Sequence, residues 1–207
     1  MILTIAHSKG GSKKSTTCWH LANGLRKRYP NKKVFVIDID TQQTITIINS
    51  IRKQKAKLDE FIIYQPKNIA SLLSILEFHK DDIVLIDTGG FDKDINRTAI
   101  KKADMVLVPL MASIHDVLGF RMFSAILKDI GVSKVNILIT MVHHRQKNFD
   151  EISEALAAFK EAKLLNSKIP NHSENYKTMA LGLSIYDIDS KLCKYGYEGV
   201  IDELFFI

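Results

Sequence analysis

The stretch Lys9-Gly10-Gly11-Ser12-Lys13-Lys14-Ser15-Thr16-Thr17 decides the fold of this chain. It follows an apolar run over Met1–Ala6 and precedes a segment with helical periodicity. In such an arrangement the backbone N–H groups of a glycine-bearing loop and of a helix N-terminus point at an anion, and a lysine adds a full positive charge. The stretch therefore predicts a phosphate-binding loop.

The loop departs from the standard phosphate-loop pattern G-x-x-x-x-G-K-[ST] at both glycines. Lys14 and Ser15 match the last two positions, but Lys13 stands where the second glycine belongs, and residues 6–8 hold no glycine at the first position. An ordinary Gly-Gly turn before a lysine-rich helix is the plain alternative. Cations at a helix N-terminus oppose the helix dipole, so the crowded lysines favour a bound anion.

The length and the net charge of the chain limit its domain organisation and the class of its partners. The 207 residues predict one domain over 1–207, and the net charge of +6 with a pI of about 9.2 favours an anionic partner. A generally basic surface is the alternative. The basic residues gather in three clusters that resemble phosphate-neutralising patches on DNA-binding proteins: Arg26-Lys27-Arg28 with Lys32-Lys33; Arg52-Lys53 with Lys55 and Lys57; and His143-His144-Arg145 with Lys147.

The two cysteines, Cys18 and Cys193, show no metal-binding spacing and no disulfide framework, which favours a reducing cytoplasm. Met1–Ala6 is too short for a signal peptide and lacks a basic leader, and no apolar run approaches the length of a membrane span. We therefore expect a cytoplasmic protein.

Short apolar runs alternate with segments of helical period. Runs that are apolar throughout are typical of strands buried on both faces, so the pattern predicts a doubly wound α/β fold, with a mostly parallel sheet and helices on both faces. The expected strands are Ile2–Ala6, Val34–Ile39, Ile83–Ile86, Met105–Leu110 and Val135–Met141, with Phe61–Tyr64 as a possible addition. Ligands in such folds bind beyond the carboxyl ends of the strands.

The helical periodicity predicts four helices, and the polar segment Asn166–Lys177 with Pro170 is interpreted as a loop. The apolar end, Gly199–Ile207, is expected to dock as a short helix. The four predicted helices are Ser15–Tyr29, Asn68–His79, Asp116–Ile130 and Phe149–Ala162.

Carboxylates end two of the expected strands. Asp38 and Asp40 close Val36-Ile37-Asp38-Ile39-Asp40, and strand alternation sends both side chains to one face, where they could orient a water and support Mg²⁺. A helix N-cap at Asp40 is the alternative. Asp87 ends Ile83-Val84-Leu85-Ile86-Asp87-Thr88 in the Walker B manner, which predicts a Mg²⁺-holding acid.

Taken in order, these motifs resemble the deviant Walker A ATPases of the ParA/MinD group. The resemblance rests on residues 9–16, on Ile37-Asp38-x-Asp40-x-Gln42 and on Ile86-Asp87-Thr88, and it continues through 103–109 to Ser113 and Asp116. It implies a P-loop NTPase fold of the small, plasmid type of ParA protein. Helix capping is an equally open interpretation of Ser113 and Asp116.

The resemblance also implies a role for each site residue. Lys9 would reach across a sandwich dimer to the partner's phosphates, Lys14 would be the P-loop lysine, and Asp40 would help place the attacking water. Mg²⁺ would be held by Ser15 and Asp87, with Asp38 supporting the metal site. ATP would be bound by Lys9, Gly10, Gly11, Ser12, Lys13, Lys14, Ser15 and Thr16.

The implied function is partition of plasmid or chromosomal DNA by slow ATP hydrolysis. Expected partners are ATP and Mg²⁺, a second copy of the chain, non-specific DNA and a centromere-binding, ParB-like adaptor, with localisation on the nucleoid and no membrane. We keep two alternatives. If the position of Lys13 needs positive φ, strain of about 1–3 kcal/mol would favour a nucleotide-binding scaffold with weak or lost hydrolysis. A MinD-like membrane ATPase would need a basic amphipathic tail, whereas Gly199–Ile207 carries two acids and no basic residue.

Overall fold

The computed structural model describes residues 1–90, 93–160 and 162–205. They form one parallel seven-stranded sheet in the order β3-β2-β4-β1-β5-β6-β7, which confirms the predicted α/β fold. The strands are β1 (Ile2–Ile5), β2 (Val34–Asp38), β3 (Ile63–Tyr64), β4 (Ile83–Asp87), β5 (Met105–Met111), β6 (Val135–Val142) and β7 (Ala162–Pro170).

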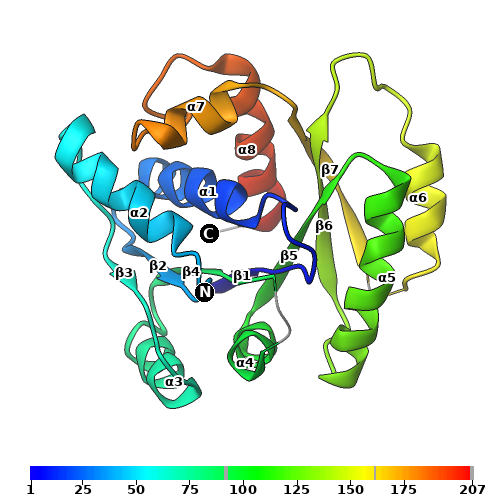
Figure 1. The fold of residues 1–207 in the computed structure, drawn as a ribbon, viewed down its shortest axis with the longest axis horizontal. Helices are drawn as coiled ribbons and strands as arrows, with labels where there is room; N and C mark the ends of the chain where they lie inside the picture. The colour runs from blue at the N-terminus through cyan, green and yellow to red at the C-terminus, as the bar shows by residue number, and fades with distance from the viewer. Residues whose placement is uncertain (91–92, 161, 206–207) are drawn as a thin grey trace.

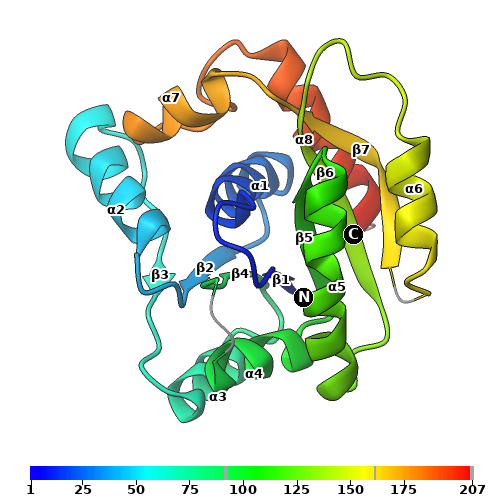
Figure 2. The same ribbon diagram turned by 45° about the vertical axis from the view of Figure 1, so that its right-hand side comes forward.

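Helices cover both faces of the sheet (Figures 1 and 2). One face carries α1 (Lys14–Arg28), α2 (Thr44–Ile51), α7 (Glu174–Ala180) and α8 (Lys191–Leu204), with a π-helical turn η1 (Arg52–Ala56) continuing α2. The other face carries α3 (Ile69–Phe78), α4 (Asp94–Lys102), α5 (Ile114–Asp129) and α6 (Asp150–Ala157).

The hydrophobic core follows from the continuous apolar strands, which contribute buried side chains to both faces. On the α1 face, Trp19 and Tyr197 are among the largest fully buried side chains, and they pack with Leu3 and Leu85 from the sheet. The opposite face is filled from α3 to α6, with Phe120 at its centre. Among the described residues, no helix has the length and apolar character needed to cross a bilayer.

The register of the sheet brings the predicted motifs together. Asp38 of β2 lies opposite Asp87 of β4, and Asp87 lies opposite Ile5 of β1. The loop that follows β1 therefore starts beside both carboxylates, at the carboxyl edge of the sheet where parallel α/β folds bind ligands.

Several element boundaries differ from the prediction. The loop expected over Asn166–Lys177 is wrong: β7 extends to Pro170, and α7 begins at Glu174. Among the described residues, β7 pairs with β6 alone, at the edge of the sheet. It buries Leu165 and Ile169, and most of its other residues are polar, which gives a weak strand signal.

Besides α7, the described residues form two further helices that were not predicted, α2 and α4. The segment that forms α2 is rich in Thr and Ile, which lose rotamer freedom in helices and favour strands. The α4 segment has few apolar residues. The predicted helix Phe149–Ala162 is shorter in the structure, at Asp150–Ala157, whereas the C-terminal helix already begins at Lys191. The last two residues of the predicted Gly199–Ile207 segment lie outside the described residues.

Candidate nucleotide site

A cavity of about 460 Å³ opens at the loop between β1 and α1, within the size range of small-ligand pockets. The predicted phosphate loop forms one wall, and the segment after β2 forms the other. The described lining residues are Ser8, Gly10, Gly11, Ser12, Lys13, Lys14, Ser15, Thr16, Asp40, Thr41, Gln42, Thr44 and Gly90.

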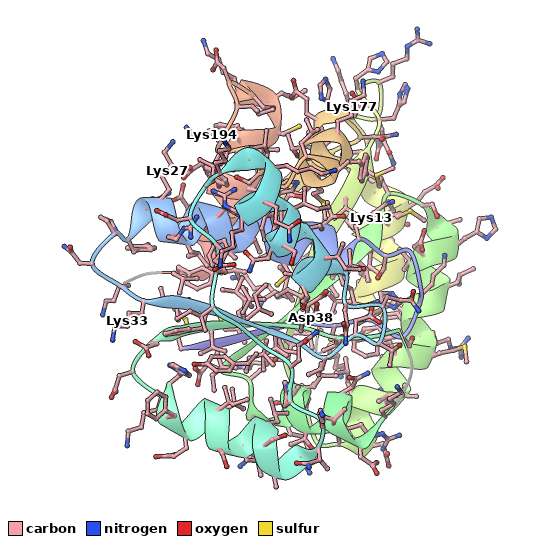
Figure 3. The ribbon with its side chains drawn as sticks, turned by 60° about the vertical axis from the view of Figure 1, so that its left-hand side comes forward. Lys13, Lys27, Lys33, Asp38, Lys177 and Lys194 are labelled. Atoms are coloured by element: carbon pink, nitrogen blue, oxygen red, sulfur yellow. The ribbon has the colours of Figure 1, made fainter. Side chains whose placement is uncertain are left out.

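The residue that breaks the phosphate-loop pattern has a left-handed backbone. Lys13 has φ 69° and ψ 25° at the start of α1, and Gly11 has φ 76°. A side chain in this region costs about 1–2 kcal/mol relative to glycine. The Lys13 amine lies 4.8 Å from the centroid of the Tyr176 ring on α7, a cation–π contact that offsets part of this strain. Lys13 therefore joins the loop to α7, and Figure 3 shows it at the N-terminal end of α1.

Lys14 is buried and folds back over the loop. Its Nζ donates to the Lys9 carbonyl at 3.2 Å and lies 3.5 Å from the Ser12 hydroxyl. Burial lowers the pKa of Lys14, and Asp87 and Asp40 oppose that shift. The ammonium is thus held by weak partners in a polar recess, where phosphate oxygens would be much stronger acceptors.

His7 fixes the start of the loop. Its Nδ1 accepts the N–H of Lys9 at 2.9 Å, and its ring stacks on Phe123 with a centroid distance of 5.5 Å. Burial, reinforced by Lys14, lowers the pKa of His7 to about 4, so the ring is neutral at pH 7. These contacts give His7 a structural role at the start of the loop.

Lys9 is engaged by its own chain. Its Nζ lies 2.5 Å from Asp116 Oδ1 on α5, with 42% of the lysine side chain exposed against 2% of the aspartate. Ser113 donates to the same carboxylate at 3.0 Å, and its Oγ accepts the Asp116 N–H, so it caps α5. The capping interpretation of Ser113 thus holds, and Asp116 has the additional contact with Lys9.

The two aspartates after β2 differ in their surroundings. Asp38 is buried and accepts three hydrogen bonds, from the Asp40 N–H and from both the N–H and the hydroxyl of Thr46 on α2. Figure 3 shows Asp38 at the level of the sheet, near α2. Asp40 lines the cavity, and its Oδ1 accepts the Gln42 N–H at 3.0 Å. Asp40 is therefore placed to meet a ligand, whereas Asp38 supports α2.

Asp87 is fully buried, and among the described residues neither of its oxygens has a hydrogen-bond partner within 3.5 Å. Burial raises the pKa of Asp87 to about 8, with the nearby Ser15 hydroxyl and Lys14 opposing the rise. Orphaned buried carboxylate oxygens are rare in folded proteins and indicate a missing partner. A hard cation fits: Ser15 and Asp87 would hold Mg²⁺, which neutralises the carboxylate and adjacent phosphates when bound.

We predict that Asp87→Asn changes the pH dependence of stability. In the folded chain Asp87 keeps its proton up to a pKa of about 8, whereas in the unfolded chain it loses the proton near 3.8. The native chain therefore loses stability as pH rises through this window, by up to about 1.4 kcal/mol per pH unit from this group. The variant should gain stability relative to the native chain between pH 5 and pH 8 in urea titrations without Mg²⁺ or nucleotide. Parallel stability curves for the two proteins would contradict the buried, unpaired state of Asp87.

The predicted basic clusters are partly neutralised within the chain. Arg52 is buried in a bidentate ion pair with Asp187. Other members are also engaged: Arg26 with the carbonyls of Asp59 and Glu60, Arg28 with Glu198 and Asp202, and Lys53 with Glu60. Lys27, Lys32, Lys33, Lys55 and Lys57 remain exposed in the first two clusters, as do His143, His144, Arg145 and Lys147 in the third.

Sequence reasoning did not find Tyr176, the partner of Lys13. It lies more than 160 residues after the loop and belongs to a segment interpreted as a loop. No motif marks it, because only the packing of α7 beside α1 brings it to the site.

Comparisons with known proteins agree with this geometry. The family model of an AAA domain matches residues 1–81. A search of curated proteins found no match.

Solved structures resemble nearly the whole chain. Apo McdA from Cyanothece has a TM-score of 0.78 at 17% identity, with 99% of each chain covered. The MinD cell division protein of Aquifex aeolicus has a TM-score of 0.76 at 16% identity, over 98% of this chain and 96% of that one. A putative plasmid partition protein from Borrelia burgdorferi B31, bound to AMPPNP, has a TM-score of 0.65 at 22% identity, over 97% and 96%. Together with the motifs, these similarities establish that the chain has the fold of a ParA/MinD-type P-loop ATPase.

Proposed function

We propose that this chain is a ParA-like partition ATPase that binds Mg-ATP, dimerises, binds DNA without sequence preference and hydrolyses ATP slowly. The observation that carries the proposal is the cavity between the β1–α1 loop and Asp40, with the orphaned Asp87 carboxylate beneath it. A phosphate chain and a cation would satisfy the groups gathered there.

In this proposal the loop from Lys9 to Thr16 holds the phosphates. Its backbone N–H groups and the N-terminus of α1 supply donors, and Lys14 exchanges its weak contacts with Lys9 and Ser12 for phosphate oxygens. Ser15 and Asp87 hold Mg²⁺, and Asp38 orders the segment through Thr46. Asp40, on the opposite wall, orients the attacking water.

Dimerisation is proposed through Lys9. Its side chain is 42% exposed, but it is held by Asp116 of its own chain at 2.5 Å. To reach the phosphates bound by a partner, Lys9 has to leave Asp116. Because the Asp116 side chain is only 2% exposed, the partner's phosphates would have to offset the loss of the cation that pairs with this buried carboxylate. The partner's ATP would thus compete with Asp116 for the same ammonium.

A second function is favoured by the backbone of Lys13. A side chain at φ 69° in the phosphate loop, tied to Tyr176, restricts how closely the loop can adapt to phosphates. The chain could then bind nucleotide and act as a DNA-associated scaffold with weak or lost hydrolysis. The end of α8 is not the basic amphipathic element that a MinD-like membrane role would use: it carries Asp202, which pairs with Arg28, and Glu203, which accepts the N–H groups of Asn166 and Ser167.

The Lys13→Gly variant separates the two functions. We expect it to bind ATP at least as tightly as the native chain, because glycine lets the loop adapt to the phosphates without a side chain in the left-handed region. Its net folding stability should change little, since the cation–π contact with Tyr176 is lost at the same time. The measurements are ATP affinity by calorimetry and phosphate release at saturating ATP. Tyr176→Phe is the control, because it keeps an aromatic face for Lys13.

Turnover decides between the alternatives. Hydrolysis by the native chain supports the partition ATPase, whereas hydrolysis by Lys13→Gly alone supports the scaffold. If neither protein binds ATP, both functions are refuted.

DNA binding is proposed to use the exposed lysines of the second basic cluster. The double variant Lys55→Gln/Lys57→Gln should weaken binding to unrelated duplex DNA and reduce the slope of log affinity against log salt by about 0.9 for each lost phosphate contact. The matched control is Lys101→Gln/Lys102→Gln, which removes two exposed lysines from α4 on the opposite face of the sheet. Titrations at several salt concentrations, with and without ATP, give the slope of log affinity against log salt for each protein. Binding that ignores salt, or an equal loss in the control, would contradict this surface.

The ParB-like adaptor and localisation on the nucleoid follow from the same proposal. Both depend on the ATP-dependent dimer, so a pull-down of DNA from cell extract should require ATP. Stimulation of turnover by an adaptor is expected only when DNA and ATP are both present.

A further inference from the structure

Three side chains with metal-binding atoms converge where α7 and α8 begin. His172 precedes α7, Glu174 is its first residue, and Cys193 lies in the first turn of α8. Their ligand atoms all lie within 4.8 Å of one another, and His172 Nδ1 is 3.3 Å from Glu174 Oε2. The described residues that line the nucleotide cavity do not include any of the three.

The three ligand atoms are of the kinds that bind a transition metal of intermediate softness. Imidazole nitrogen, carboxylate oxygen and thiolate sulfur are the ligands of Zn²⁺, which binds them in tetrahedral geometry at about 2.0–2.3 Å. Bond lengths of that size set ligand atoms roughly 3.3–3.7 Å apart. The separation of His172 Nδ1 and Glu174 Oε2 already meets this distance, and the Cys193 sulfur lies within 4.8 Å of both ligand atoms. We propose that His172, Glu174 and Cys193 form a Zn²⁺-class metal site that uses three protein ligands and a water.

Burial around the cluster suits such a site. Cys193 is fully buried, whereas His172 and Glu174 are half-buried with about 40% of each side chain exposed, which leaves a path for the ion and a place for the fourth ligand. Ser190 donates a hydrogen bond to Glu174 Oε2 and orients the carboxylate, as partners of metal ligands commonly do. On metal binding the thiol proton would be released to solvent.

Helix capping explains only part of this arrangement. An acid in the first turn of α7 is favourable by itself, and Ser190 lies at the start of α8. His172 Nδ1 also accepts the N–H of Glu174 at 3.4 Å at the start of α7, but capping does not require the sulfur of Cys193 at the same point. The sequence gives no hint of the cluster, because its two parts are separated by about twenty residues.

The site would connect two elements that meet above α1. Figure 3 marks these helices by Lys177 on α7 and Lys194 on α8. A metal ion would fix the start of α7 to α8, two residues before Tyr176, whose ring contacts Lys13 of the phosphate loop. The proposal stands apart from the proposed ATPase function, because it can be tested without nucleotide.

The test is a titration of the full chain with Co²⁺ as a spectroscopic probe, followed by competition with Zn²⁺. We expect one equivalent of Co²⁺ to produce a thiolate-to-cobalt charge-transfer band and the intense visible bands of four-coordinate cobalt. Zn²⁺ should abolish both and raise the Tm. His172→Ala, which alters a half-exposed side chain outside the core, should weaken Co²⁺ binding at least tenfold, and Cys193→Ser should remove the charge-transfer band.

Two variants serve as matched controls. Cys18→Ser removes the other buried cysteine, and His144→Ala removes an exposed histidine of the β6–α6 loop. Both should bind Co²⁺ like the native chain. The proposal is overturned if the native chain gives no thiolate band, if the band persists in Cys193→Ser, or if His172→Ala binds Co²⁺ with native affinity.

Discussion

Replacing Lys14 with alanine is expected to weaken ATP binding roughly a hundredfold, and to reduce turnover at subsaturating ATP by at least as much. The ammonium is buried at the base of the cavity, where a contact with a phosphate is little screened by water. Loss of one partner from a buried charge pair costs about 2–5 kcal/mol, and about 3 kcal/mol corresponds to a factor above one hundred in affinity.

Calorimetric titration with ATP measures this loss directly. Lys27→Ala is the control, because it removes an exposed lysine from the same helix and leaves the loop intact. The two variants should have similar Tm values, since Lys14 makes only weak contacts within the chain. An unchanged ATP affinity in Lys14→Ala would place the nucleotide elsewhere.

Arg52→Ala is expected to lower the free energy of unfolding by about 3–5 kcal/mol, the usual range when one partner of a buried ion pair is removed. The guanidinium is 4% exposed and pairs with Asp187 through contacts of 2.7 and 3.1 Å. It also donates to the carbonyls of Asp59 and Gly182. The substitution would leave a carboxylate and two carbonyls without this donor.

Urea unfolding measures the effect, and Lys53→Ala is the matched control. Lys53 is the next residue and pairs with Glu60, but it is largely exposed, so its removal should change stability by less than about 1 kcal/mol. The pKa of Asp187 is lowered by its hydrogen bonds with Arg52 and Ser184. The pair therefore stabilises the fold above the ordinary carboxyl pKa, and the difference between Arg52→Ala and the native chain should shrink as pH falls below about 4. Equal losses for the two variants would refute a structural role specific to Arg52.

The central sheet was predictable because its strands are buried on both faces and read as continuous apolar runs. Reading elements from the pattern of apolar residues did not succeed at the edges of the fold. β7 mixes polar and apolar residues without strict alternation, α2 is rich in Thr and Ile, and α4 is mostly polar, so none of the three shows the hydrophobic periodicity of its element clearly. Their structures depend on tertiary contacts that no short window of sequence contains.

The positions of the phosphate loop and its acidic residues were predictable from the sequence, but the contacts of their side chains were not. Spacing placed Lys14, Asp40 and Asp87 at one edge of the sheet. It could not reveal that Lys9 pairs with Asp116, that Lys13 turns to Tyr176, or that Asp87 has no hydrogen-bond partner among the described residues. The first two contacts come from α5 and α7, which reach the loop from distant parts of the chain.

The cavity at the β1–α1 loop is proposed to bind Mg-ATP. The most direct measurement is a calorimetric titration of the native chain with ATP, in Mg²⁺ and then in EDTA. We predict one ATP per chain, with tighter binding in Mg²⁺ because the cation would neutralise the buried Asp87 carboxylate and the phosphates together. Absence of ATP binding under both conditions would contradict the claim, as would an affinity that Mg²⁺ does not change.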